Sequence, residues 1–329
     1  MRSGAIIDAG VDKPEVQLTG ERQPRTVPGV YSGLLASFFL GWAPVLAKFA
    51  YRANVDPITL ASLRTLVAAV FLWCVYLLFW RRRILIGWRS LLSCLLVGAI
   101  NGVGSLFYYT ALARLDASRA AMLGAIYPVW VVLFLSASGQ RTKTGTLAQL
   151  VASLAGAILV TSPWHESNPA DYLGVMLMLA SAAVNGWYMV MGQWVLAEVP
   201  SRSGTLYIIT GMALTVSVAR LFDTTPMPVQ IPLLGVYAIL ALGLTTALSR
   251  MAMFFSLEKL GGAETAILNL VELAVSLALA FLFLGDRLEW YQWLGAMLLL
   301  GGGLMARYRA EQGRVIPSAF DPMAATVQR

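Results

Sequence analysis

Charged side chains lie in the middle of apolar segments at four places in this sequence. Glu272 stands inside "TAILNLVELAVSLALAFLFL", residues 265–284, and Lys48, Arg64 and Arg250 interrupt other apolar runs. Placing an Asp, Lys or Arg at the centre of a membrane helix costs about 2.5–3.5 kcal/mol, so such residues usually face a cavity or a partner. Charges of both signs around one cavity would bind a small polar or charged molecule.

Polar residues at helical spacing accompany these charges. Along residues 265–276 the polar positions are four, three and four residues apart, which places them on one face of a helix. We predict that this stripe and three like it line a central cavity; the alternative is that they only form hydrogen bonds between helices. The four sets are Thr265, Asn269, Glu272 and Ser276; Thr246, Arg250 and Met253; Ser181, Asn185, Tyr188 and Gly192; and Asn101, Ser105 and Tyr108.

Arg250 and Glu272 carry opposite charges, and pairing them would offset the cost of burying each one. Two interpretations follow. The charges bind the carboxylate and the ammonium group of a zwitterion, or they form a salt bridge that joins two helices. Glu272 could also carry a coupling proton or remain a fixed anion, and the sequence leaves both roles open.

Tyr127, Pro128 and Trp130 lie at the midpoint of the apolar segment 117–137. A proline within a helix removes one backbone hydrogen bond and kinks the helix, which frees a carbonyl to meet a ligand. The aromatic rings suit an apolar or aromatic part of a substrate, with packing as the alternative for Trp130. The predicted substrate-binding residues are therefore Asn101, Tyr108, Tyr127, Trp130, Asn185, Tyr188, Arg250, Asn269 and Glu272.

A coupling or gating role is predicted for a second set of intramembrane residues. Lys48 and Arg64 belong to it because they are the remaining basic residues inside apolar segments, although snorkelling or pairing with carbonyls is the alternative for both. Pro128 and Glu272 complete the set.

The composition of the chain is that of a membrane protein. Of its 329 residues, 58% are hydrophobic and only 12% are charged, against about 25% charged in soluble domains. We expect no nucleic-acid partner, because the basic residues are spread over short loops and tails. We also expect no enzyme activity, metal or cofactor, since no nucleophile with a base, no metal-ligand spacing and no phosphate-binding glycine loop is found.

Ten segments are long enough to cross a bilayer as helices, which takes about 20 mostly apolar residues. With the N-terminus inside, sixteen basic residues fall on the cytoplasmic side and five on the opposite side, so both termini are predicted to be cytoplasmic. Residues 1–29 and 309–329 are expected to be cytoplasmic tails, the first of them disordered. The segments are 30–50, 58–80, 90–112, 117–137, 145–162, 171–195, 204–222, 232–257, 262–284 and 289–308.

The two halves of the chain resemble each other. "ALARLDASRAAMLGAIYPVWVVLFL", residues 111–135, aligns with "SLEKLGGAETAILNLVELAVSLALA", residues 256–280, at a constant shift of 145 positions. The repeat unit therefore holds five helices, 30–163 in the first copy and 170–308 in the second. An odd number of spans turns the second copy upside down. The predicted fold is all-α and integral to the membrane, with ten transmembrane helices as two inverted five-helix repeats.

Three stretches are similar to the EamA-type ten-helix exporters of the drug/metabolite transporter superfamily. They are "GWAPVLAKFA" with "DPITLASLRTLVAAVFL", "ARLDASRAAMLGAIYPVW" and "LGDRLEWYQWLGAMLLLGGGL". The resemblance implies an inner-membrane exporter of amino acids and related metabolites that works by alternating access around a central cavity. Two positions depart from the family pattern: Leu273 stands where a proline is usual, and Arg250 where an uncharged residue is usual.

Other functions stay open at this point. A transporter of the same fold could carry organic anions or nucleotide-linked sugars, as the three intramembrane cations would allow. A membrane enzyme or a lipid-handling scaffold is the alternative from another class. The expected partners are a small-molecule substrate and the lipid bilayer, and we expect a monomer, because ten helices can enclose a path within one chain.

Overall fold

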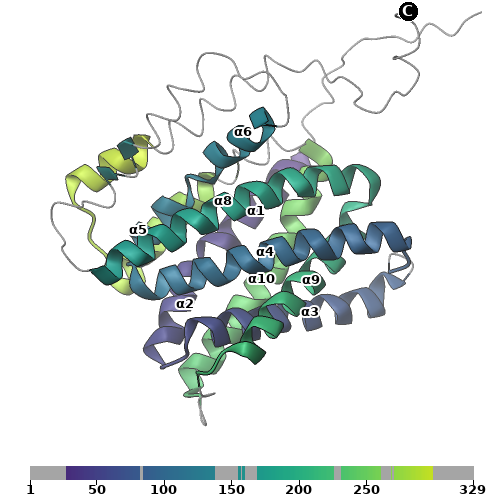
Figure 1. Ribbon diagram of the computed structural model, residues 1–329, viewed down its shortest axis with the longest axis horizontal. Coiled ribbons are helices and arrows are strands. Elements are labelled where there is room, and N and C mark those ends of the chain that lie inside the picture. The colour runs from purple at the N-terminus through teal and green to yellow at the C-terminus, as the bar shows by residue number, and fades with distance from the viewer. Residues whose placement is uncertain are drawn as a thin grey trace, which may run out of the picture.

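The computed structural model describes residues 27–81, 84–137, 155–156, 158–159, 169–225, 231–260, 268 and 270–298. Within this part of the chain every regular element is a helix, and the helices run alongside one another in one bundle (Figure 1). The all-helical architecture predicted from the apolar segments is confirmed at this level. The elements are α1 (Val27–Gly41), α2 (Ala43–Arg52), α3 (Pro57–Phe79), α4 (Trp88–Arg114), α5 (Ala117–Gly124), α6 (Tyr127–Ala137), α8 (Pro169–Glu198), α9 (Ser201–Phe222), α10 (Leu233–Leu260), α12 (Leu270–Leu279) and the π-helical turn η2 (Ala280–Leu284).

Six stretches of the described residues are long and apolar enough to cross a membrane, so the chain is a multi-pass membrane protein. They are Pro28–Arg52, Pro57–Phe79, Trp88–Arg114, Tyr172–Gly192, Ser201–Phe222 and Leu233–Ser256. Of the other predicted spans, the fourth is divided between α5 and α6, the ninth is described from Leu270 onward, and the tenth is helical over 290–298. Most of the fifth lies outside the described residues. The full set of ten spans stays a prediction.

Two of the spans are broken near their middle. A turn at Trp42 separates α1 from α2, and α2 has a proline, Pro44, in its first turn. A second turn at residues 125–126 separates α5 from α6, directly before Tyr127 and Pro128. Proline has no amide to donate, and the first turn of a helix needs none, so helices readily begin at such positions. The predicted disturbance at Pro128 thus takes the form of a complete break just before the proline.

The packing of the helices follows a twofold pattern. Helix α4 of the first half packs against α8 and α9 of the second half. Likewise, α10 of the second half packs against α1 and α3 of the first half. In the same way α6 packs on α8 while α12 packs on α1, and α3 packs on α9 across the centre. Figure 1 shows α4 beside α8 and above α9 in this arrangement. Each half therefore supplies helices that cover the other half.

Glycines allow the closest of these contacts. A Cβ added to Gly98 of α4 would lie 2.2 Å from the carbonyl oxygen of Ile208 in α9, and one added to Gly211 would lie 2.5 Å from the carbonyl oxygen of Leu95. Because both obstacles are backbone atoms, neither can move aside without separating the helices. Residues without a side chain at such contacts let two membrane helices approach closely.

Candidate functional site

A cavity of about 180 Å³ lies at the centre of the bundle. Its wall is formed by the junction of α1 with α2, and by α3, α4, α5, α8, α9, α10 and α12, together with the turn between α5 and α6. Three charged side chains reach it: Arg64 from α3, Arg250 from α10 and Glu272 from α12. In a protein interior that is otherwise apolar, a concave site with a few convergent polar groups is the place where a small molecule binds.

Arg64 is the most firmly held of the three charges. Its side chain donates to the hydroxyl of Thr246 at 3.0 Å and to the hydroxyl of Ser105, and its guanidinium lies 4.3 Å from the centre of the Tyr109 ring. Only 5% of the residue is exposed. Arg64 thus bridges α3 to α4 and α10 and orients Tyr109. The Nε of Arg64 has no hydrogen-bond partner.

Lysine at position 64 is expected to keep the charge and lose this bridge. An ammonium group cannot serve two hydroxyls in a planar fork and stack on a ring as well. We expect Arg64→Lys to lower the free energy of unfolding by about 2 kcal/mol, since hydrogen bonds to charged groups contribute roughly 1.5–3 kcal/mol. Thermal unfolding in detergent measures this, with the exposed Arg89→Lys as control. Equal stability of the two variants would contradict the bridging role.

Arg250 is held more loosely. One guanidinium nitrogen donates to the Tyr188 hydroxyl at 3.3 Å and approaches the sulfur of Met253 at 3.9 Å, while the group lies 5.3 Å from the centre of the Tyr188 ring. The residue is half-buried, and its Nε has no partner. Tyr188 itself is 1% exposed, so it lies behind Arg250 and supports it. Arg250 is therefore less constrained by its neighbours than Arg64.

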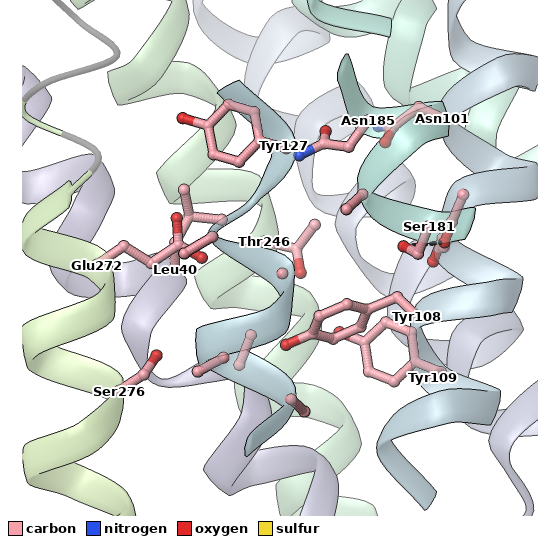
Figure 2. Close-up of a pocket in the computed structure, with 18 of the residues that line it drawn as sticks. Leu40, Asn101, Tyr108, Tyr109, Tyr127, Ser181, Asn185, Thr246, Glu272 and Ser276 are labelled. Carbon is pink, nitrogen blue, oxygen red and sulfur yellow. Dashed lines mark hydrogen bonds between the residues drawn. The ribbon is translucent and has the colours of Figure 1, made fainter. Parts of the chain in front are cut away.

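Glu272 lines the same cavity from α12. It projects from the same helix as Ser276, which donates to the carbonyl of Gly41 at 3.0 Å (Figure 2). Arg250 attracts the Glu272 carboxylate, but the two do not form an ion pair within 4.0 Å; the pairs that join described side chains are Asp116 with Arg119 and Arg220 with Asp223. The salt-bridge interpretation of Arg250 and Glu272 does not hold in this conformation.

Uncharged polar groups form the rest of the wall. Figure 2 shows Asn101 and Asn185 close together, with Tyr127 on one side of them and Ser181 on the other. The Asn101 amide donates to the sulfur of Met212 at 3.3 Å, and the Ser181 hydroxyl donates to the carbonyl of Gly104 at 2.8 Å. Ser181 therefore ties α8 to α4.

The structure places most of the predicted residues at this one cavity. Substrate-binding candidates that line it are Asn101, Tyr108, Tyr127, Asn185, Arg250 and Glu272, and the gating candidate Arg64 also lines it. Some members of each of the four stripes therefore meet at one cavity, whereas Tyr188 and Gly192 do not line it and Thr265 and Asn269 lie outside the described residues. Whether they bind a substrate is a separate matter of function.

Five other candidates lie elsewhere or are not described; one of them is Tyr188, which lies behind Arg250 and does not line the cavity. Trp130 stacks on Phe134, with ring centres 6.0 Å apart, and packs against α8 at Gly186 because glycine leaves room for it there. Lys48 is on α2 and does not line the cavity, and the carboxylates of Asp116 and Asp286 attract it. Asn269 and the side chain of Pro128 lie outside what the structure describes.

Some residues of the wall were not expected from the sequence. Tyr109 lies under Arg64 with its hydroxyl-bearing ring at the cavity, and Met189 and Met212 add sulfur atoms to the wall. Tyr109 follows Tyr108 directly, and consecutive residues point about 100° apart on a helix, so spacing placed it on another face. The methionines look like ordinary apolar positions, and only the tertiary structure shows them at the site.

The charged and polar side chains of the cavity wall can bind and orient a small charged molecule by ionic attraction and hydrogen bonds. Among the described residues, no group of three or more His, Cys, Asp or Glu side chains is placed to hold a metal ion. A multi-pass helical protein with a polar, charged cavity at the centre of its bundle has the form of a membrane transport protein.

The comparison with known proteins agrees with this class. The model of the EamA-like transporter family matches residues 27–162 and again residues 172–308. The chain belongs to the EamA-like transporter family, which confirms the resemblance drawn from its motifs. The family and the relative described next are both named as transporters rather than enzymes.

Two individual relatives add to this. The uncharacterized transporter YcbK of Bacillus subtilis (strain 168) is 24% identical over 264 residues, which cover 75% of this chain and 82% of YcbK. A solved crystal structure superposes with a TM-score of 0.61 at 18% identity and covers 86% of this chain and 98% of the other. The second likeness shows a shared fold.

Proposed function

We propose that this protein is a secondary transporter that exports small amphipathic metabolites, most plausibly amino acids, by alternating access around the central cavity. The observation that carries the proposal is the presence of Arg250 and Glu272 in one cavity without a direct ion pair between them. A free cation and a free anion across a small cavity are complementary to a zwitterion. The cavity volume of about 180 Å³ suits a zwitterion of the size of an amino acid.

The two ends of an amino acid have distinct partners in this scheme. Arg250 binds the carboxylate, because it lines the cavity and the residue is only half-buried. Charge-assisted hydrogen bonds from arginine to a carboxylate are among the strongest in proteins. Glu272, which lines the same cavity, binds the ammonium group. Arg64 is a positioning residue here, since two hydroxyls and the Tyr109 ring already hold it.

The side chain of the substrate has an apolar part of the cavity to fill. Met189, Met212 and Met253 line it together with the rings of Tyr108 and Tyr109. Methionine adapts to varied shapes and makes favourable contacts with aromatic rings. Amino acids with aromatic or sulfur-containing side chains are therefore the first to test.

Alternating access rests on the inverted-repeat architecture, which we propose for the whole chain. The twofold packing pattern supports it: α4 meets α8 and α9 in the way that α10 meets α1 and α3. Related halves of this kind rock about a fixed central site. We further propose ten membrane spans, cytoplasmic termini and an inner-membrane location, supported by the distribution of basic residues. One chain supplies the whole cavity wall, so a monomer suffices.

Counterflow in proteoliposomes tests the proposal. Vesicles are loaded with one unlabelled amino acid, and labelled phenylalanine, methionine or threonine is added outside. The expected result is transient, saturable accumulation of label that empty vesicles do not show. Absence of accumulation with every amino acid, in protein that is monodisperse and folded, would overturn the proposed substrate class.

An anionic substrate is the second candidate, and one observation favours it. Two guanidinium groups and one carboxylate line the same cavity, so the charges of its wall sum to plus one when all are ionised. Phosphate esters, organic anions and nucleotide-linked sugars would suit such a wall. The same vesicles distinguish the two candidates: an amino-acid carrier keeps its counterflow in the presence of these anions, and an anion carrier exchanges them instead.

Loss of the loosely held arginine should weaken binding more than it weakens the fold. Arg250→Gln removes the charge but keeps one donor, and we expect the half-saturation concentration for an amino acid to rise about 30-fold, since a hydrogen bond to a charged group contributes about 1.5–3 kcal/mol. Counterflow at varied substrate concentration measures it, beside the exposed Arg89→Gln. An unchanged half-saturation concentration would show that Arg250 does not touch the substrate.

A further inference from the structure

A tight apolar cluster, which we call the floor, lies next to residues of the cavity wall. Val45 of α2, Ala117 of α5, and Leu279 and Ala280 at the junction of α12 with η2 form a cluster in which no residue is more than 9% exposed. Partly buried side chains pack around these four, among them the ring of Trp42. The floor is therefore built by three helical segments that also supply the cavity wall.

The floor lies one helical turn beyond the wall. In α5, Ala120 lines the cavity and Ala117 is in the floor, and at the end of α12, Ser276 lines the cavity and Ala280 is in the floor. Residues three or four apart lie above one another on a helix. The described helices thus pass from cavity to floor in a single turn, and α5 and α12 converge there.

A polar contact lies at the same end of the bundle. One carboxylate oxygen of Asp286 accepts hydrogen bonds from the backbone amide of Ser118 at 3.1 Å and from the Ser118 hydroxyl at 3.0 Å. Ser118 is in the first turn of α5, where Asp116 stands at the N-cap but makes no capping bond with its side chain. Asp286 takes over the capping of α5 from a point 168 residues away in the chain.

The backbone near Asp286 is specially shaped for this contact. The turn η2 is π-helical, and its wider winding ends at Gly285, which has a φ of +75°. Glycine adopts this left-handed conformation without strain. The amide of Asp286 then donates to the carbonyl of Ala280 at 3.3 Å, which fixes the chain as it leaves the floor.

Lys48 brings a positive charge near this contact from a third element, without an ion pair to either carboxylate within 4.0 Å among the described residues. It lies on α2, and the carboxylates of Asp116 and Asp286 both attract its ammonium group. The three residues come from both halves of the chain. Their attraction favours the arrangement in which α2, α5 and η2 are together.

We propose that the contact between Asp286 and Ser118 is the latch of a gate that closes the cavity at this end. The inference rests on the proposed alternating access, because a rocking of the two halves has to separate α5 from η2 when the cavity opens here. The latch stabilises the closed state, and Asp286 acts on transport through the position of α5 rather than by touching the substrate.

Accessibility of the cavity tests the latch without any substrate. A single reporter, Ala121→Cys on the cavity wall, is placed in a chain whose Cys74 and Cys94 are replaced by alanine. A membrane-impermeant thiol reagent is added to oriented proteoliposomes from each side in turn. We expect Asp286→Asn to raise the labelling rate about tenfold, and Ser118→Ala about threefold, from the side of the latch only. The matched control is Asp223→Asn, which breaks the ion pair with Arg220 elsewhere in the bundle.

Equal labelling rates with and without Asp286 would overturn the latch. A second variant covers the case in which Asp286→Asn does not fold: the thiols of a Ser118→Cys, Asp286→Cys double variant are joined by a short bifunctional thiosulfonate. Joining them should abolish counterflow, and a reducing agent should restore it. Counterflow by the cross-linked chain would overturn the latch even if the proposed substrate is right. If no amino acid gives counterflow but Asp286→Asn still raises the labelling rate, only the proposed substrate is overturned.

Discussion

Glu272→Gln is expected to lower counterflow of an amino acid at least a hundredfold while the protein remains folded. Glutamine has almost the same shape as glutamate, so the cavity keeps its size and Ser276 keeps its bond to α1. The variant loses the negative charge that holds the ammonium group. The ammonium group of the bound substrate is then a buried charge without a partner, which costs about 3–5 kcal/mol. Initial counterflow rates in proteoliposomes give the effect.

The control is Glu289→Gln, since Glu289 is an exposed carboxylate outside the cavity. It should transport as the unmodified chain does. A different outcome would reassign the residue: if Glu272→Gln keeps full counterflow but no longer accumulates substrate in response to a pH gradient, Glu272 carries a coupling proton and does not bind the substrate. Full activity in both assays would make its role structural.

Alanine at position 98 should produce the largest loss of stability. Its Cβ would lie 2.2 Å from the carbonyl oxygen of Ile208 and 2.9 Å from the amide nitrogen of Met212, so α4 and α9 have to move apart. Overpacking of this kind typically costs about 1–3 kcal/mol and occasionally more, and we expect about 3 kcal/mol here because the obstacles are backbone atoms. Thermal unfolding in detergent, followed by size-exclusion chromatography, measures the loss.

Gly192→Ala is the matched control for this substitution. Gly192 also lies within a long helix, α8, but a Cβ added there meets no atom within 4 Å. Alanine is favoured over glycine inside a helix by roughly 0.5–1 kcal/mol, so this variant should be equally stable or slightly more stable. If both alanine variants unfold at the same temperature, close approach of α4 and α9 is not what requires Gly98.

The sequence predicted the long helices well because bilayer length and polarity alone delimit them. The segment predicted as 58–80 is Pro57–Phe79, and the one predicted as 90–112 is Trp88–Arg114. The break at Trp42 and the π-helical turn at Ala280–Leu284 were not predicted, since an apolar run looks the same whether its helix is continuous or interrupted. Such irregularities depend on packing against other helices.

The candidate site was predictable where polar residues repeat at helical spacing. Asn101 and Glu272 could be placed on one face of a helix, and both line the cavity. Trp130 could not be assigned, because an aromatic residue at mid-membrane fits a cavity and a core equally well, and Gly186 decides for packing. The bridging contacts of Arg64 to Ser105 and Thr246 join three helices that no sequence pattern brings together.

Binding of blocked amino acids tests the central claim most directly, namely that Arg250 and Glu272 hold the two ends of one zwitterion. Affinities of an amino acid, its methyl ester and its N-acetyl derivative are measured for the unmodified chain, Arg250→Gln and Glu272→Gln. We predict that the unmodified chain prefers the free amino acid to both derivatives, that Arg250→Gln no longer distinguishes it from the ester, and that Glu272→Gln no longer distinguishes it from the N-acetyl form. If each variant weakens all three ligands by the same factor, the two residues do not bind opposite ends of the substrate.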